Sequence, residues 1–369
     1  MKILFIIELY YPHIGGAEVL FKNLAEKLVE KGNEITVLTT RLSGYQKEEI
    51  IGGVKIIRLN CGNRYLFTFL AWWQGWKLAR EVDLIQTTTY NAALPAWIVA
   101  KLSKKPCIIT VHEYWSEFWK KVPGFTLLHR IFEWFVISLP FDEYIADSRY
   151  TAKCLLVSGI KAKKIKVIYP GIDYDLFNKD KYDRNKSRKK FEFKSSDFIY
   201  LYFGRPGWAK GLEYLIKATP KISQKIPNSK FLLILSHTPN KQYKWMLKLI
   251  SQLSTTNRQR LIIYDPVPRE KLPEYLKIAD CVVVPSLMEG FGFTAAEACS
   301  LRVPLVASKT GSLPEVVSGK VVWIRSGDES SLVKGVTKLF HRKWEIIPTR
   351  RFEWDDCIEK YLDVYKSIL

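Results

Sequence analysis

The sequence predicts an α/β protein built from two doubly wound domains. Short runs rich in Val, Ile, Leu and Phe alternate with helical stretches along the chain, a pattern typical of parallel strands with helices on both faces of a sheet. The alternation stops at residues 179–194 and then begins again. A chain of 369 residues is also too long for one comfortable core. These observations together favour two domains joined by a linker.

The first series of elements predicts an N-terminal domain over residues 1–178. It begins with a strand at KILFII and an amphipathic helix near residues 17–31, which Gly32 ends. The rest of the series follows in the order EITVLTT, VKIIRL, DLIQTT, a helix around 92–103, PCIITVH, EYIADS, a helix around 149–157 and IKVIYPG.

Residues 179–194, KDKYDRNKSRKKFEFK, contain eight Lys and Arg against three Asp and Glu and almost no aliphatic side chain. Such a segment cannot bury enough apolar surface to order itself, so we expect an exposed basic linker. A second domain is then predicted over 195–345, followed by a helical segment over 346–369. Its elements are FIYLYFG, a helix near 211–226, KFLLILS, a helix around 240–254, RLIIYD, a helix around 269–278, CVVVPS, a helix over 293–300, VPLVAS and VVWIR.

The charge balance narrows the kind of partner. There are 57 Lys and Arg against 37 Asp and Glu, a net charge of +20, which attracts phosphorylated ligands, acidic lipid or nucleic acid. The six cysteines are far apart with no C-x-x-C pair, which is typical of reduced thiols rather than of a zinc site. The N-terminal apolar run is interrupted by Glu8 and lacks a cleavage site, so we expect a strand there and a cytoplasmic protein.

Two segments combine aromatic residues with Lys and Arg. They are RYLFTFLAWWQGWKLAR and WKKVPGFTLLHRIFEWFVISLPF, and neither reaches the length of about 18 apolar residues that a spanning helix needs. Helix-spaced aromatic residues usually fill a core. The composition is also that of a helix at the inner surface of an anionic membrane. Both interpretations are open at this point.

In doubly wound sheets, ligands bind outside the carboxyl ends of the strands, so residues there are the first candidates. Gly15 and Gly16 follow the first strand and could bring backbone close to a phosphate, although a simple tight connection explains them equally well. Arg205 follows the strand FIYLYFG, and Lys210 lies at the start of the next helix. Two cations there suit a diphosphate, whereas solvated surface charges are the plain alternative.

The stretch MEGFGFTAAEA places one carboxylate, Glu289, before a helix and a second, Glu297, on its second turn. Gly290 and Gly292 bring backbone N–H groups to the helix start, where an anion is favoured. Carboxylates accept hydrogen bonds from vicinal hydroxyls, so one could hold a sugar and the other a ribose. A capped helix with solvated acids is the alternative.

His112 ends the strand CIITVH, where its side chain could donate or accept a proton. The other four histidines have no comparable setting, and no H-x-x-x-H or H-E-x-x-H spacing indicates a metal site. We reject Asp173 and Asp175 as a metal-binding pair, because they lie beside the linker and away from the other candidates. Glu18 is expected only to favour the start of its helix.

Taken together, these segments resemble glycosyltransferase family four, the retaining nucleotide-sugar enzymes with the GT-B fold. The matching pieces are PHIGGAE, ADS, VIYPGID, GRPGWAKG, ADCVVVPSLMEGFGFTAAEA, GSLPEVV and FEWDDCIEKYLDVYKSIL, and they cover nearly the whole chain. The resemblance implies two Rossmann-like domains that face each other across a cleft, with a C-terminal helix that returns to the first domain.

The resemblance also implies roles for individual residues. Gly16 backbone would meet the diphosphate, Arg205 and Lys210 would neutralise it, and no metal would be required. The donor sugar and the nearby phosphate would be held by Glu289 and by the backbone of Phe291, Gly292 and Phe293. Glu297 would hold the ribose, Val267 would lie near the base, and His112 would lie beside the transferred sugar.

Three departures from the family pattern put the identity of the donor in doubt. They are SHTPN after the strand FLLIL, Arg302 before VPLVAS, and Ala209 before Lys210. The acceptor is expected on the first domain, as a lipid-linked or membrane-surface glycan. A noncatalytic nucleotide-sugar-binding protein is the main alternative, and dispersed basic residues without a recognition helix argue against nucleic acid.

Overall fold

The computed structural model describes residues 1–13, 15–62, 64–122, 124 and 126–369. The motif PHIGGAE includes residue 14, and the second aromatic segment includes residues 123 and 125; these three positions lie outside the described residues. The chain divides into two compact units. Unit 1 contains Met1–Gly171 and Phe352–Leu369, and unit 2 contains Ile172–Arg351.

Unit 1 is built on an eight-stranded sheet of strand order β3-β4-β2-β1-β5-β6-β7-β8. All neighbours pair in parallel except β3 and β4 at the edge. The strands are β1 (Lys2–Ile6), β2 (Glu34–Thr40), β3 (Glu48–Ile51), β4 (Val54–Leu59), β5 (Leu84–Thr88), β6 (Cys107–Val111), β7 (Glu143–Ala146) and β8 (Ile165–Val167). The helices, including two 3₁₀ turns, are α1 (Gly16–Glu30), α2 (Arg64–Ala79), α3 (Ala93–Ser103), η1 (Ser116–Lys121), α4 (Thr126–Ser138), α5 (Arg149–Val157), η2 (Ala162–Lys164) and α14 (Trp354–Ile368).

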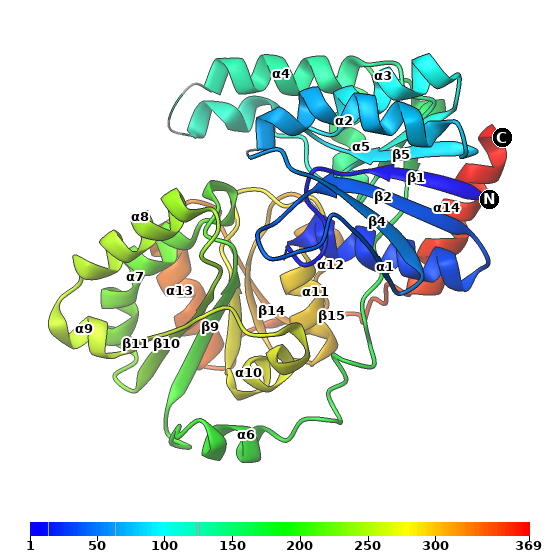
Figure 1. Cartoon of the computed structure of the whole chain (residues 1–369). Coiled ribbons are helices and arrows are strands. Elements are labelled where there is room, and N and C mark those ends of the chain that lie inside the picture. Colours follow the sequence, from blue (N-terminus) through cyan, green and yellow to red (C-terminus); the bar gives the residue numbers. More distant parts are fainter. Residues whose placement is uncertain (14, 63, 123, 125) are drawn as a thin grey trace. The chain divides into compact units, whose positions relative to one another are not determined.

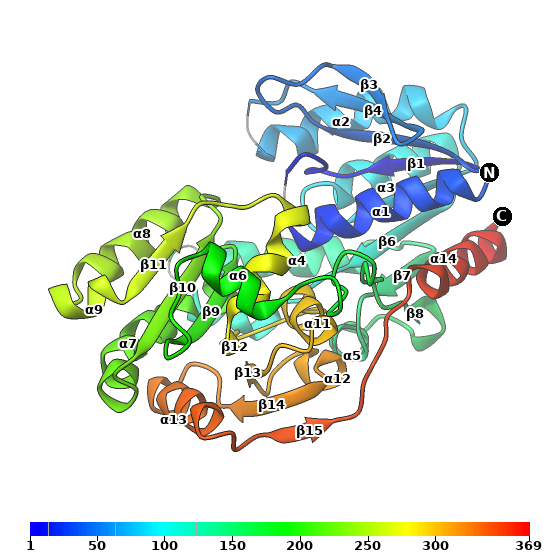
Figure 2. The same cartoon turned by 90° about the horizontal axis from the view of Figure 1, so that it is seen from below.

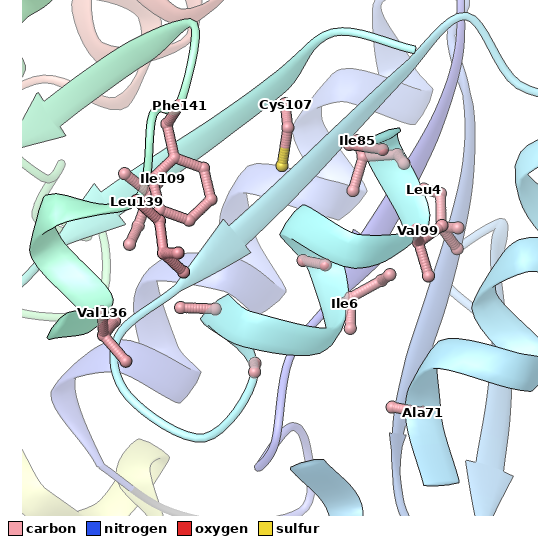
Figure 3. Packing of buried hydrophobic residues seen from close by; sticks show 14 of the residues in the cluster. Leu4, Ile6, Ala71, Ile85, Val99, Cys107, Ile109, Val136, Leu139 and Phe141 are labelled. Atoms are coloured by element: carbon pink, nitrogen blue, oxygen red, sulfur yellow. The ribbon is translucent and has the colours of Figure 1, made fainter. Parts of the chain in front are cut away.

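Helices cover both faces of the unit 1 sheet. In Figure 1, α2, α3 and α4 form a layer above the strands, whereas α1 and α14 lie below them and come into full view in Figure 2. The upper layer encloses an apolar core in which Val99 of α3 packs with Leu4 and Ile6 of β1 (Figure 3). Because strand side chains alternate between faces, this core takes every second residue of β1.

The C-terminal helix α14 belongs to unit 1. Its buried face includes Trp354, Tyr361 and Tyr365, and the Tyr361 hydroxyl lies 3.1 Å from the hydroxyl of Thr110 on β6. A Cβ atom on Gly171 would lie 2.4 Å from the Trp354 ring, so only glycine permits this close approach.

Unit 2 contains a seven-stranded sheet of order β11-β10-β9-β12-β13-β14-β15, parallel except for the edge strand β15. Its strands are β9 (Phe198–Gly204), β10 (Ser229–Leu235), β11 (Leu261–Tyr264), β12 (Cys281–Val284), β13 (Leu305–Ser308), β14 (Gly319–Ile324) and β15 (Glu345–Ile347). Its helices and 3₁₀ turns are α6 (Arg184–Lys190), η3 (Trp208–Lys210), α7 (Leu212–Lys225), α8 (Asn240–Ser251), α9 (Thr255–Gln259), η4 (Arg269–Lys271), α10 (Leu272–Ile278), α11 (Phe293–Ser300), α12 (Leu313–Val316) and α13 (Glu329–Phe340).

Alternate residues of β9 pack on opposite faces of the unit 2 sheet. Tyr200 and Tyr202 enter the core beneath α7 and α13, whereas Leu201 enters the core beneath α10 and α11. Both sheets therefore carry apolar cores on two sides, and the predicted pair of doubly wound α/β sheets is confirmed.

The predicted exposed linker over residues 179–194 is wrong. Residues 184–190 form helix α6, which Asp183 caps by accepting a hydrogen bond from the Lys186 backbone N–H. Arg188 is buried, where it donates to the Ile278 carbonyl and at 2.6 Å to Asp280. The ring of Phe191 packs 4.5 Å from that of Tyr275. Paired charge and aromatic contacts order a segment whose composition alone indicated disorder.

The boundaries between the units also differ from the predicted ones at 178 and 346. Residues 172–178 belong to unit 2, where Phe177 is fully buried and its carbonyl accepts a hydrogen bond from Ser300. Residues 346–351 belong to unit 2 as well. The six cysteines are all free; four are buried, and Cys154 and Cys299 are partly exposed.

Candidate active site

The candidate site of unit 2 lies where its strand order reverses. Strand β9 has β10 on one side and β12 on the other, so the loops that follow β9 and β12 meet at the switch point of the sheet. The Leu287 N–H donates to the Ala209 carbonyl at 2.7 Å. Gly211 has a φ of 64°, and a Cβ there would lie 2.1 Å from the Pro285 carbonyl oxygen. Glycine is therefore required for the two loops to come together.

Lys210 and Glu289 form an ion pair at this point. The Lys210 Nζ donates to Oε2 of Glu289 at 2.9 Å, and the Ser286 hydroxyl donates to Oε1 at 2.8 Å. Glu289 is buried, whereas Lys210 is partly exposed. The Ser312 N–H donates to the Glu289 carbonyl, and Gly311 packs too closely on the Glu289 backbone to carry a side chain. Glu289 is thus fixed on both its side chain and its backbone.

Arg205 lies on the same edge of the sheet. Its carbonyl accepts a hydrogen bond of 2.9 Å from the buried Tyr202 hydroxyl. Burial raises the pKa of Tyr202, the Glu289 charge raises it further, and the Arg205 charge lowers it. Arg205 and Lys210 both follow β9, and Lys210 is the one whose side chain pairs with Glu289.

Helix α11 begins next to these charges. Gly292 is its N-cap with a φ of 93°, and the rings of Phe291 and Phe293 lie 5.1 Å apart in an edge-to-face contact. The Ser312 hydroxyl donates to the Phe291 carbonyl at 2.8 Å, which holds the turn in place with the buried Gly290 inside it. The first N–H groups of a helix have no partner within it, so they present positive potential that suits a phosphate.

Glu297 lies one turn into α11 and is paired with Arg269. The Arg269 guanidinium lies 2.6 Å from Oε1 of Glu297 and stacks 5.1 Å above the Phe177 ring. Burial raises the pKa of Glu297, Arg269 opposes this, and Asp173 adds to it. Val267 is half-buried two residues before Arg269. Arg269 and Asp173 were missed as neighbours of Glu297, because no short-range spacing in the sequence joins them.

In unit 1, His112 is held by a carboxylate. Its Nδ1–H donates to Oδ2 of Asp147 at 2.5 Å, and its Nε2 is buried with no hydrogen-bond partner among the described residues. Burial alone would lower the pKa of His112, but Asp147, Glu18 and Glu113 together raise it above its ordinary value. The ring therefore has a fixed orientation and one nitrogen left for a ligand.

The start of α1 lies next to His112. The rings of Phe21 and His112 are 5.8 Å apart, and the buried Glu18 accepts a hydrogen bond of 2.9 Å from Nδ1 of His13. Gly16 is the first residue of α1, and Gly15 is its N-cap in an extended conformation that any residue adopts. The sequence assigned no chemistry to His13 or Glu18. The contribution of Glu18 to the His112 environment becomes visible only when β6 and α1 come together.

Comparison with known families identifies the chain. Residues 14–176 match the model described as Glycosyltransferase Family 4, and residues 183–351 match the model described as Glycosyl transferases group 1. The chain belongs to glycosyltransferase family four. It is a glycosyltransferase that takes its sugar from a nucleotide-sugar donor.

Relatives extend this likeness over the whole chain. A glycosyltransferase of Methanocaldococcus jannaschii is 26% identical, covering 99% of this chain and 98% of the relative. A D-inositol 3-phosphate glycosyltransferase of Xylanimonas cellulosilytica is 24% identical over 95% of this chain and 91% of the relative.

Solved structures share the GT-B fold. Sucrose-phosphate synthase of Thermosynechococcus elongatus has a TM-score of 0.80 at 20% identity, covering 99% of this chain and 98% of that one. The HepE protein of Anabaena in complex with UDP-glucose has a TM-score of 0.79 at 19% identity, with each chain covered completely. The family-four fold expected from the motifs is confirmed.

Proposed function

We propose that the chain is a retaining hexosyltransferase that moves a hexosyl unit from a UDP- or GDP-sugar to a hydroxyl of a lipid-linked or cell-surface glycan. The observation that carries the proposal is the Lys210–Glu289 pair at the start of α11, at the switch point of the unit 2 sheet. Family membership and the UDP-glucose complex of the HepE protein support it.

The donor would bind along α11 in an extended arrangement. Glu289 accepts hydrogen bonds from hydroxyls of the donor sugar, and the N–H groups around Phe291, Gly292 and Phe293 bind the diphosphate together with Gly15 and Gly16 backbone. Glu297, held by Arg269, accepts from the ribose hydroxyls, and Val267 contacts the base. Glu289 precedes α11 and Glu297 lies on its second turn, which supports this order of sugar, diphosphate and nucleoside.

Catalysis follows from where charge develops. When the bond from the sugar anomeric carbon to the phosphate oxygen breaks, negative charge grows on the leaving diphosphate. Lys210, Arg205 and the α11 amides stabilise that charge, so the reaction needs no metal ion. The acceptor oxygen forms the new bond on the same face of the sugar, and its proton passes to the leaving phosphate oxygen. The anomeric configuration is thereby retained.

His112 would bind a hydroxyl of the transferred sugar through Nε2. Asp147 accepts a hydrogen bond from Nδ1–H and fixes the ring, which leaves Nε2 to act on the substrate. We place the acceptor on unit 1 and the reaction in the cytoplasm, at the inner face of the membrane.

A panel of UDP- and GDP-sugars tests the proposal. We expect one donor to raise the thermal unfolding temperature and to undergo slow hydrolysis, and we expect turnover to be lost in Glu289→Ala. Binding without turnover for every donor and acceptor would instead indicate a noncatalytic nucleotide-sugar-binding protein. The anomeric configuration of the product, measured by NMR, tests the mechanism, since an inverted product contradicts it.

A further inference from the structure

Helix α2 buries mostly small residues and exposes six large apolar ones. Toward the sheet it presents Phe67, Ala71, Gly75 and Ala79, all buried, and a Cβ on Gly75 would lie within 3.1 Å of side chains on β1 and α3. The opposite face carries an aromatic and aliphatic stripe of Tyr65, Leu66, Phe69, Leu70, Trp72 and Trp73. Most of its large apolar residues thus face outward, whereas an ordinary surface helix turns them inward.

Helix α4 also exposes large apolar side chains. Its carboxylate Glu133 is buried, where it accepts hydrogen bonds from the Tyr90 hydroxyl and from the backbone N–H groups of Trp115 and Ser116. Its exposed face carries Leu127, Leu128, Ile131, Trp134 and Phe135. The helix buries Val136 and Ile137 in the core, but it leaves these five large apolar side chains outside.

The two stripes lie on the same side of unit 1. Phe67 and Ala71 of α2 and Val136 of α4 pack into the same core above the sheet, so the opposite faces of both helices point away from the strands (Figure 1). Of the 21 large hydrophobic side chains that are exposed among the described residues, 11 lie on these two helices. We call these 11 residues of α2 and α4 the aromatic face.

Cations outnumber exposed acids on this layer, although Arg130 of α4 pairs with Glu117 of the neighbouring η1. Helices α2, α3 and α4 contain four Lys and Arg residues, and their single acid is the buried Glu133. The Lys77 Nζ lies 4.9 Å from the Trp73 ring centroid, and the Arg80 guanidinium lies 4.3 Å from that of Trp76. Cations next to exposed Trp residues are complementary to a surface that is negatively charged outside and apolar beneath.

We propose that the aromatic face is a docking surface for an anionic lipid bilayer, with α2 and α4 lying in the headgroup region. Among the described residues no helix is both long and apolar enough to cross a membrane. The proposed contact is therefore with the bilayer surface. The docking surface would bring the enzyme to a lipid-linked acceptor. That link rests on the proposed function. The absence of exposed acids from the three helices favours anionic lipid over an acceptor protein or a second copy of the chain.

Vesicle sedimentation of the full chain tests the surface without using enzyme activity. Wild-type protein is expected to sediment with vesicles of equal phosphatidylglycerol and phosphatidylcholine, and to be released by raised salt or by phosphatidylcholine alone. The variant Phe69→Gln/Trp134→Gln changes side chains that are 68% and 57% exposed, so the core is untouched. We expect this variant to bind the vesicles at least about tenfold more weakly than wild type.

A matched control changes equally exposed apolar residues elsewhere. Ile50→Gln/Ile346→Gln alters side chains that are 73% and 76% exposed on edge strands, and it should sediment like wild type. Three results would overturn the proposal. Wild type does not sediment, the control loses as much binding as the variant, or Phe69→Gln/Trp134→Gln binds as wild type does. A dimer, seen by light scattering, that this variant abolishes would also overturn it.

Two further readouts separate this proposal from the proposed function. Quenching of wild-type Trp fluorescence by brominated lipid in the same vesicles is expected, and its absence contradicts insertion even if the variant does not fold. Donor hydrolysis in solution should be equal in wild type and in Phe69→Gln/Trp134→Gln. If vesicles bind but no donor is hydrolysed, the proposed function fails while the docking surface stands.

Discussion

Lys210 is the residue at which the donor site can be tested most directly. Its ammonium is paired with Glu289, which precedes the N-terminal turn of α11. We expect Lys210→Ala to lower kcat/KM by roughly 10²- to 10³-fold, because charge on the leaving diphosphate loses one stabilising donor. Steady-state release of the nucleoside diphosphate measures the effect.

Lys221→Ala provides the control for Lys210→Ala. Lys221 is an exposed residue on α7, and its removal should leave kcat/KM close to wild type. Lys210→Arg, which keeps the charge, should recover part of the lost activity. Wild-type activity in Lys210→Ala would contradict the proposed role.

The His112–Asp147 pair predicts a pH-dependent stability. The folded-state pKa of His112 is raised, so the pair stabilises the fold fully below the unfolded pKa of about 6.5 and loses this as the pH rises through the folded pKa. Asp147→Asn should therefore cost about 1–3 kcal/mol near pH 6 and less near pH 9. Urea unfolding at the two pH values measures it. In a His112→Gln background the pH dependence of the Asp147→Asn effect should disappear, and its persistence would assign it to another group.

The candidate site residues stand out in the sequence, whereas their contact partners do not. Glu289, Lys210 and Arg205 stand at strand ends next to glycines, which is a local signal. Asp147 and Arg269 act through contacts with residues 35 and 28 positions away, at His112 and Glu297. Spacing carries no information on such contacts, because they depend on how whole strands align.

Among the elements, the loops after β9 and β12 depend on a single glycine. Gly211→Ala would place a methyl group 2.1 Å from the Pro285 carbonyl oxygen at a positive φ, so both the backbone and the loop must move. We expect a loss of about 3 kcal/mol or more in unfolding free energy.

Gly319→Ala separates steric overlap from backbone strain. Gly319 has a φ of 77° with no atom within 4 Å of an added Cβ, so its substitution should cost only about 1–2 kcal/mol. Thermal or urea unfolding compares the two variants. Equal losses would show that contact with the β12 loop is unimportant.

Elements that bury a continuous apolar run were predicted well. Helices α5 and α11 begin and end where expected, and the central strands lie within a few residues of their predicted bounds. The edge strands β3 and β15 were missed because each is short, charged and half-exposed. Helix α6 was missed because composition counts Arg188 as a charge, whereas Asp280 and two carbonyls bind it.

For the whole molecule, the proposed chemistry predicts ligand-dependent stability without a metal. The cations and helix amides of unit 2 would bind the nucleoside diphosphate directly. UDP or GDP, whichever the donor carries, should therefore stabilise the chain against unfolding by about 2.7 kcal/mol at 100 times its Kd. Differential scanning fluorimetry measures this shift. EDTA should change neither the shift nor turnover, and a loss of either that Mg²⁺ restores would contradict the metal-independent mechanism.

The path of the chain between the units sets the order in which they can fold during synthesis. Unit 2 is one uninterrupted stretch, whereas unit 1 needs its final 18 residues, Phe352–Leu369, which supply Trp354, Tyr361 and Tyr365 to its interior. On the ribosome, the unit that emerges first is therefore the last that can close its core. A chain that stops just before Phe352 would contain all of unit 2, whereas its unit 1 would expose the apolar surface that α14 covers.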